Sequence, residues 1–178
     1  MVRFFLCAGI IGLSWTAGYC YTSRWRRRCR YLKYMSEMFQ SMQIQMQYRL
    51  DPLPVLFQRT AEKLRREENG CEALRQLFSE AAKKMADGRG DSADEIWGGT
   101  VMETLKETAL KKEDMAELAS LGGDLGSTEI QLQKKAMGHI TEKLLFMEKE
   151  AQAECKKNTK LYRTLFTAGG IVIVILLI

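Results

Sequence analysis

The residues that could carry out acid–base chemistry are one histidine and acids that are spread along the chain beside basic residues. Their spacing does not bring them together. The one histidine, His139, has Lys135 and Lys143 four residues away on either side, so all three would share one helix face. Catalysis needs a nucleophile, a base and an orienting group that can converge. We therefore interpret His139 as a solvated or interface histidine and predict that the protein is not an enzyme. The enzymatic alternative would require His139 or a pair of acids to be buried in a cleft.

Metal and phosphate chemistry are not indicated either. The glycine-rich stretch 122–126 lacks the preceding strand, the lysine and the Ser/Thr of a phosphate-binding loop. The five cysteines are odd in number and form no C-x-x-C pair, which argues against a disulfide framework or a zinc site. They are Cys7, Cys20, Cys29, Cys71 and Cys155, and we interpret them as reduced thiols, consistent with a cytosolic domain. No cofactor, metal or small-molecule substrate is predicted.

Positive charge is concentrated toward the two ends of the chain. Of 27 Lys and Arg residues, Arg3 and ten others lie outside residues 34–155, which leaves 16 against all 22 acids, or about −6 for the middle. The ten are Arg24, Arg26, Arg27, Arg28, Arg30 and Lys33, then Lys156, Lys157, Lys160 and Arg163. We predict that they flank membrane segments, where basic residues mark the cytoplasmic side. A nucleic-acid partner is not predicted, because it would need a basic face on the folded domain.

Residues 1–22 are predicted to form an N-terminal transmembrane helix. The eighteen residues 4–21 carry no charge, and at 1.5 Å per residue they would span about 27 Å, close to the thickness of a bilayer core. A cleaved signal peptide is the competing interpretation. It is disfavoured because only Arg3 precedes the apolar stretch, whereas the basic cluster follows it.

Residues 161–178 are predicted to form a C-terminal transmembrane helix. Their apolar part, 165–178, would be about 21 Å long as a helix, which is short for a full crossing. The alternative is a helix end buried against protein or a partner. Both basic clusters lie on the inner side of their segments, so we expect a two-pass protein of the cell membrane whose domain, 23–160, is cytoplasmic.

The domain reads as a series of helices. Apolar residues at helical spacing between 31 and 46 predict a helix that continues from the N-terminal segment. Asp51 is expected to cap the next helix, with Pro52 in its first turn and a stop at 69–70. A further helix is predicted over 71–85, followed by a polar loop at 87–91. The capping box of Ser92 and Glu95 opens the next helix, and another is predicted over 112–121.

One long helix is predicted from Thr128 into the C-terminal segment, because this stretch contains no proline and, before Gly169, only one glycine, Gly138. Its heptad-like apolar positions are Ile130, Met137, Ile140, Leu144, Met147, Ala151 and Leu161. This helix and the first one begin or end at the same membrane surface, so they should lie side by side. The predicted fold is an all-α antiparallel bundle of about six helices with N- and C-terminal transmembrane helices.

Three blocks of sequence resemble the stage III sporulation protein AB family over essentially the whole chain. They are residues 48–53 (Tyr-Arg-Leu-Asp-Pro-Leu), Trp97 followed by Leu105, and residues 121–126 (Leu-Gly-Gly-Asp-Leu-Gly) with Gln133. The resemblance implies a helical domain similar to the cytoplasmic domains of F-type platform proteins of type II secretion and type IV pili. It also marks a candidate structural or partner-binding motif: Leu121, Gly122, Leu125, Gly126, Glu129 and Gln133.

What the resemblance implies for function is a part in endospore formation, in the membrane complex between mother cell and forespore. The expected partners are a cytoplasmic ATPase, the AA component, and membrane channel components. The expected location is the mother-cell side of the outer forespore membrane. Our first hypothesis is thus a structural adaptor of a secretion-like channel. The second is a tail-anchored regulator that sequesters a soluble partner in a helix groove.

Overall fold

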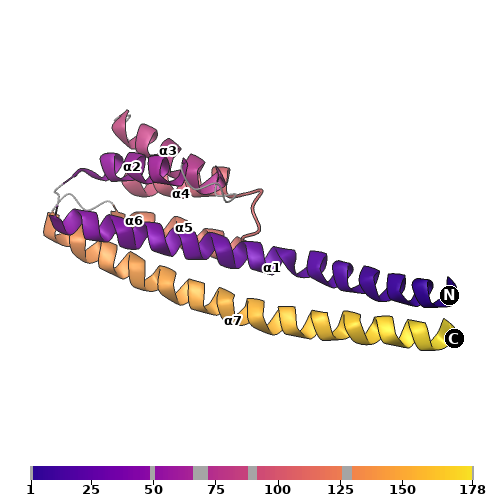
Figure 1. Ribbon diagram of the computed structural model, residues 1–178. Helices are drawn as coiled ribbons and strands as arrows, with labels where there is room; N and C mark the ends of the chain where they lie inside the picture. The colour runs from indigo at the N-terminus through magenta and orange to yellow at the C-terminus, as the bar shows by residue number, and fades with distance from the viewer. Residues whose placement is uncertain (1, 49–50, 66–71, 88–91, 126–129, 178) are drawn as a thin grey trace.

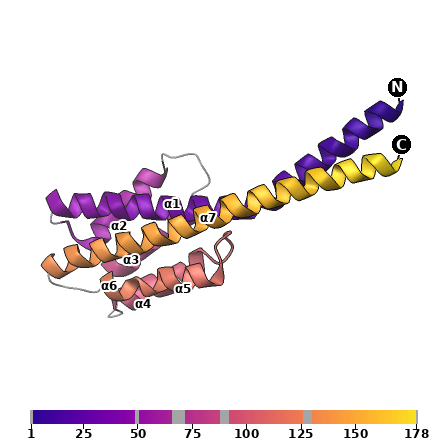
Figure 2. The same ribbon diagram turned by 90° about the horizontal axis from the view of Figure 1, so that it is seen from below.

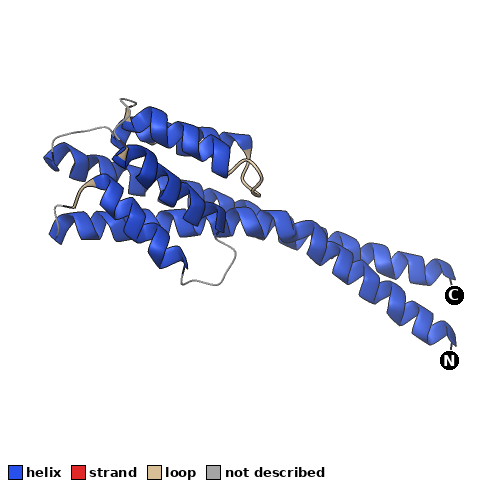
Figure 3. Ribbon diagram, turned by 90° about the horizontal axis from the view of Figure 1, so that it is seen from above, coloured by secondary structure: helices blue, strands red, loops and turns tan. Residues whose placement is uncertain are grey.

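The computed structural model describes residues 2–48, 51–65, 72–87, 92–125 and 130–177, and these residues form seven α-helices and no strand (Figures 1 and 3). Six of them have nine residues or more, and α6 is a single turn. The predicted all-α bundle of about six helices is therefore confirmed. Their bounds are α1 Val2–Tyr48, α2 Leu53–Arg65, α3 Glu72–Ala86, α4 Ala93–Thr104, α5 Lys112–Ser120, α6 Gly122–Leu125 and α7 Ile130–Leu177.

The two longest helices, α1 and α7, run antiparallel along each other and set the shape of the molecule. Figures 1 and 2 show the N- and C-terminal ends together at one end, and α2–α6 packed against α1 and α7 at the other. The predicted side-by-side arrangement of the first and last helices is therefore confirmed. Among the described residues, no helix combines the length and the apolar character that a membrane crossing requires.

The apolar stripes of α1 and α7 form the core only in the half of each helix that carries α2–α6. On α1 the stripe comprises Leu32, Met35, Met38, Phe39, Met42 and Met46, and on α7 it comprises Met137, Ile140, Leu144, Met147 and Ala151, all buried. Leu161, predicted to continue the α7 stripe, is 57% exposed because it lies beyond the packed helices. The heptad pattern thus describes the domain and ends with it.

The start of α2 differs from the prediction. Pro52 precedes the helix, and its carbonyl accepts the first hydrogen bonds, from the Val55 and Leu56 N–H groups. Pro54 takes the place in the first turn, where a missing N–H does no harm. The Asp51 carboxylate, just before α2, pairs with the Arg59 guanidinium within α2. The predicted stop at 69–70 lies outside the described residues, as do residues 88–91 of the predicted polar loop.

The start of α4 is as predicted. The Ser92 hydroxyl accepts the Glu95 N–H at 3.2 Å, and the Glu95 carboxylate accepts the Ser92 N–H at 3.0 Å. This capping box satisfies two N–H groups that a helix start leaves unpaired. It sets the register in which Trp97 enters the core, among the rings of Phe39, Phe57 and Phe78. Those four side chains join α1, α2, α3 and α4.

Candidate functional site

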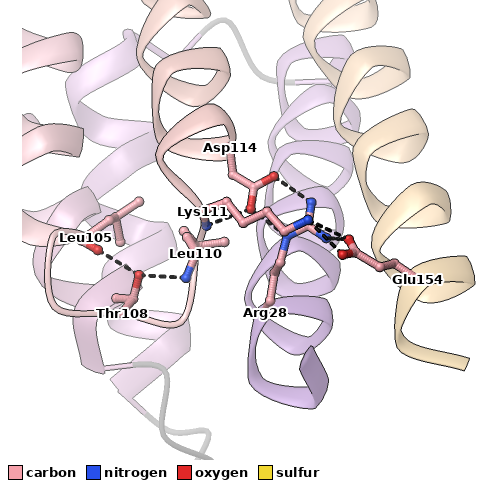
Figure 4. A network of polar contacts seen from close by, with 7 residues as sticks. All are labelled: Arg28, Leu105, Thr108, Leu110, Lys111, Asp114 and Glu154. Atoms are coloured by element: carbon pink, nitrogen blue, oxygen red, sulfur yellow. Dashed lines mark hydrogen bonds and ion pairs between the residues drawn. The ribbon is translucent and has the colours of Figure 1, made fainter. Parts of the chain in front are cut away.

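An ion-pair network that is buried at Arg28 and Asp114 and partly exposed at Glu154 and Lys111 joins α1, α5 and α7 (Figure 4). The Arg28 guanidinium donates from Nε to Asp114 Oδ2 at 2.6 Å and from Nη2 to Asp114 Oδ1 at 2.7 Å, which is a bidentate pair. Its Nη1 donates to Glu154 Oε2 at 2.5 Å. Lys111 Nζ donates to the two oxygens of Glu154 at 2.7 and 2.8 Å. Three helices distant in sequence therefore meet at one guanidinium.

Arg28 thus has a different role from the other basic residues with which it was grouped. It is only 8% exposed, whereas Arg24, Arg27 and Arg30 on the same helix are exposed. It lies one turn before Leu32 on the core-facing side of α1, so it meets the domain and not a lipid surface. The helical spacing from Leu32 was the signal that could have identified it. Asp114, which is 4% exposed, carried no signal linking it to a residue 86 positions away.

The carboxyl groups of this network are held ionised. Burial would raise the pKa of Asp114, but hydrogen bonds from the Arg28 guanidinium and the Lys111 N–H outweigh it and hold that pKa below its usual value. The pKa of Glu154 is also lowered, first by the hydrogen bond from Lys111. A carboxyl group with a depressed pKa adds stability above its unfolded-state pKa and loses it as pH falls through the folded-state value.

We therefore expect the stability provided by the network to be complete above about pH 5 and to be lost as the pH falls through the lowered pKa values of Asp114 and Glu154. In an Arg28→Ala variant, Asp114 stays buried and keeps only its contacts with Lys111, so its pKa should rise and acidification should relieve the charge that has lost the guanidinium. The stability gap between wild type and variant should be widest near neutral pH and narrow on acidification. Urea unfolding at a series of pH values measures it, and a gap independent of pH would contradict the assignment.

The glycine-containing motif is structural where the structure describes it. Leu121 and Leu125 are 1% and 2% exposed, and Gly122 is buried against the start of α4. A Cβ on Gly122 would lie 2.9 Å from the backbone oxygen of Asp94 and 3.0 Å from its Cα. Backbone atoms cannot swing aside as a side-chain end can, so glycine is required there. Gln133 is half-buried on α7, whereas Gly126 and Glu129 lie outside the described residues.

Gly122→Ala is expected to destabilise the domain by about 1–3 kcal/mol, because the added methyl must push α6 away from α4. Gly123→Ala is the matched control, since a Cβ at Gly123 meets no atom within 4 Å. Alanine also favours helix over glycine, so the control should be neutral or slightly stabilising. Urea midpoints of the two variants provide the comparison. Equal midpoints would show that the contact with Asp94 does not constrain α6.

The other nine basic residues that were predicted to flank the membrane segments surround the part of the α1–α7 pair between the domain and the chain ends. Nine of the ten are exposed or half-exposed; we call this group the basic collar: Arg24, Arg26, Arg27, Arg30, Lys33, Lys156, Lys157, Lys160 and Arg163. Beside it lie four aromatic rings in mutual contact, those of Tyr21 and Trp25 on α1 and Tyr162 and Phe166 on α7. Trp25 and Tyr162 stack at 5.2 Å between ring centroids. Aromatic rings next to basic side chains are typical of a membrane–water boundary.

The opposite character is found on α4–α6. Residues 93–125 hold eight acids and three lysines, a net charge of 3 − 8 = −5. Apart from Asp114, these acids are exposed; we call them the acidic face: Asp94, Glu95, Glu103, Glu107, Glu113, Glu117 and Asp124. His139 is exposed on α7. Among the described residues no cluster of His, Cys, Asp or Glu could hold a metal ion, and Cys20, Cys29 and Cys155 are free thiols.

Comparisons with known proteins agree with one another. The profile of the stage III sporulation protein AB family matches residues 3–178. The stage III sporulation protein AB of Bacillus subtilis (strain 168) is 24% identical over 168 residues, covering 94% of each chain. A solved structure of a stage III sporulation protein AB covers 73% of this chain and 97% of its own length, with 23% identity and a TM-score of 0.60. The predicted resemblance is confirmed, and the chain belongs to the stage III sporulation protein AB family.

Proposed function

We propose that this protein is a non-enzymatic structural adaptor in the sporulation membrane channel complex between mother cell and forespore. In this proposal it works with the cytoplasmic ATPase of stage III sporulation, the AA component, and with membrane channel components. The observation that carries the proposal is that the basic collar and the acidic face lie at different places along α1 and α7. The basic collar and both chain ends lie on one side of the domain core, and the acidic face lies on the domain itself.

Membrane attachment is the first part of the proposal. The C-terminal part of α7 exposes large apolar side chains to the surroundings: Leu161, Leu165, Ile171, Val172, Ile173 and Ile175. The uncharged stretch 4–21 of α1 runs next to this part of α7. Both ends enter the membrane together, as two passes, with the collar at its cytoplasmic surface on the mother-cell side of the outer forespore membrane. The exposed apolar side chains and the aromatic rings next to the collar support this placement.

Docking of a protein partner is the second part. The acidic face offers exposed carboxylates that have no basic partner within the described residues, apart from Glu103, which pairs with Lys84. Charges of one sign on a docking surface accelerate and orient association with a surface of opposite charge. The other candidate surface is the corner that includes Gln133.

The test is co-purification of the full-length protein with the ATPase from detergent extracts. A Glu113→Lys/Glu117→Lys variant reverses two exposed charges on the acidic face and is expected to weaken recovery of the ATPase at least tenfold. Glu142→Lys/Glu150→Lys, exposed on α7, makes the same charge change elsewhere and is the matched control. Loss of the ATPase on Gln133→Ala alone would assign docking to the corner instead.

Attachment is tested separately by accessibility labelling of a cysteine added after Ile178. Labelling from the face of the membrane opposite the mother-cell cytoplasm is expected for a two-pass protein, and labelling from the cytoplasmic face alone would contradict it. Recovery of one soluble protein, without the ATPase or other membrane components, would favour the alternative of a tail-anchored regulator.

A further inference from the structure

A groove between α1 and α7 lies within the basic collar. It has a volume of about 730 Å³, and its lining includes Arg26 and Cys29 from α1 and Lys156, Lys160 and Arg163 from α7. The rest of its lining is uncharged. Four cations therefore surround one concave surface that contains no carboxylate.

These cations have no ion-pair partner in the part of the chain that the structure describes. None of the ion pairs formed by the described residues involves Arg26, Lys156, Lys160 or Arg163. The nearest acid in sequence, Glu154, is already shared by Arg28 and Lys111. Arg26 is held in place, because its guanidinium lies 3.8 Å from the centroid of the Tyr19 ring and donates to the Tyr19 carbonyl at 2.6 Å. The groove therefore presents uncompensated positive charge, and one of its four cations, Arg26, is fixed by contacts with Tyr19.

A second depression continues the groove toward the chain ends. It has a volume of about 530 Å³ and shares Arg26, Thr159 and Arg163 with the first. Its other lining residues are uncharged: Thr16, Tyr19, Cys20 and Thr22. Charge density thus falls along the groove in the direction in which α1 and α7 reach their ends.

We propose that this groove binds an anionic phospholipid with two phosphates, of the cardiolipin type, in a defined orientation. The phosphates lie among Lys156, Lys160 and Arg163, and the acyl chains run along the less charged second depression toward the chain ends. Residues 156–163 extend about 10 Å along α7, long enough for two linked phosphates to contact different cations. Basic pockets between helices on the cytoplasmic side of a membrane bind such headgroups. The site rests on the proposed membrane attachment and adds a selective ligand to it.

The experiment compares two triple variants of the full-length protein in lipid vesicles. Lys156→Gln/Lys160→Gln/Arg163→Gln removes three charges from the groove. Arg24→Gln/Arg27→Gln/Arg30→Gln is the matched control, because it removes three exposed charges of the same collar that do not line the groove. Binding is measured to vesicles of phosphatidylcholine alone, with phosphatidylglycerol, and with cardiolipin at equal surface charge.

The wild type is expected to prefer cardiolipin over phosphatidylglycerol, and the groove variant should lose this preference while its affinity for cardiolipin falls roughly 100-fold. The control should bind all anionic vesicles less well and keep the preference. Inorganic pyrophosphate added to the solution distinguishes the sources of phosphate. Only weak competition is expected, since it lacks acyl chains, and full competition would make the site one for soluble phosphates.

The lipid site would be overturned if the two triple variants changed vesicle binding equally, or if the wild type showed no preference for cardiolipin. The collar would then only attract anionic membranes without a specific site. Vesicles of pure phosphatidylcholine separate this failure from failure of the attachment itself. Binding to them with no lipid preference removes the site and leaves the anchor. Absence of binding to every vesicle removes both.

Discussion

Replacement of Arg28 by alanine is expected to lower the free energy of unfolding by about 3–5 kcal/mol, because it leaves the buried Asp114 carboxylate without its partner. The cost arises from desolvation: the bidentate pair stabilises Asp114 in a place where water cannot. Urea unfolding in mild detergent, followed by far-ultraviolet circular dichroism, measures the change. Because the pair joins α5 to α1, we also expect residues 112–120 to exchange their amide hydrogens faster in the variant.

Two further variants make this prediction specific. Arg27→Ala removes an adjacent exposed arginine and should change stability by no more than about 0.5 kcal/mol. Arg28→Met combined with Asp114→Asn removes both charges and keeps an acceptor for the Lys111 N–H. The double variant should be more stable than Arg28→Ala, since no uncompensated charge remains. If Arg28→Ala were no more harmful than Arg27→Ala, the network would be a surface ion pair with little energetic role.

The helices and most of the core could be predicted from the sequence because both follow from local spacing. The apolar stripe 32–46 and the stripe 137–151 repeat every three or four residues, and that spacing is independent of what packs against them. The capping box of Ser92 was equally local and equally reliable. Pro52 was placed one position too far into α2, since two prolines two residues apart can each satisfy the preference for the first turn.

The basic collar shows where composition misleads. Six cations within ten residues look like one group, yet five lie at the surface or partly so and one points into the domain. They differ in the side of the helix on which each residue lies, and a count of charges does not give that side. Arg28 follows the same face as Leu32 and Met35, and its partner comes from α5 through folding alone. The groove beside it requires α1 and α7 at a specific register, so it was not predictable from either segment.

Gly122 illustrates the same limit within the family motif. The residues 121–125 were recognised as a pattern, but the sequence did not say what the glycine was for. The structure places it against the Asp94 backbone, so the motif packs α6 onto α4. The position of the acidic face on α4–α6 therefore depends on Gly122, which connects the packing of the corner to the proposed docking surface.

Replacement of Trp97 by alanine is expected to cost about 3–5 kcal/mol, since it leaves a large cavity at the centre of the domain. Trp97 is 0% exposed, and its ring contacts those of Phe39, Phe57 and Phe78. Its indole Nε1 also donates to the Leu118 carbonyl at 2.7 Å, so it joins α4 to α5 as well as to the core. Urea unfolding with the same readout as for Arg28 measures the loss.

Trp97→Phe separates the two contributions, because it keeps an aromatic ring and removes the indole donor, while the Leu118 carbonyl keeps its hydrogen bond from the Leu121 N–H at 3.3 Å. We expect an intermediate loss, with about 0.5–1.5 kcal/mol attributable to the lost indole hydrogen bond, because the carbonyl still has one donor. Met102→Ala, at an exposed position of the same helix, should stay within about 0.5 kcal/mol of wild type. If Trp97→Phe were neutral, the hydrogen bond to Leu118 would contribute nothing, and the position of α5 against α4 would depend on packing and on the Arg28 network.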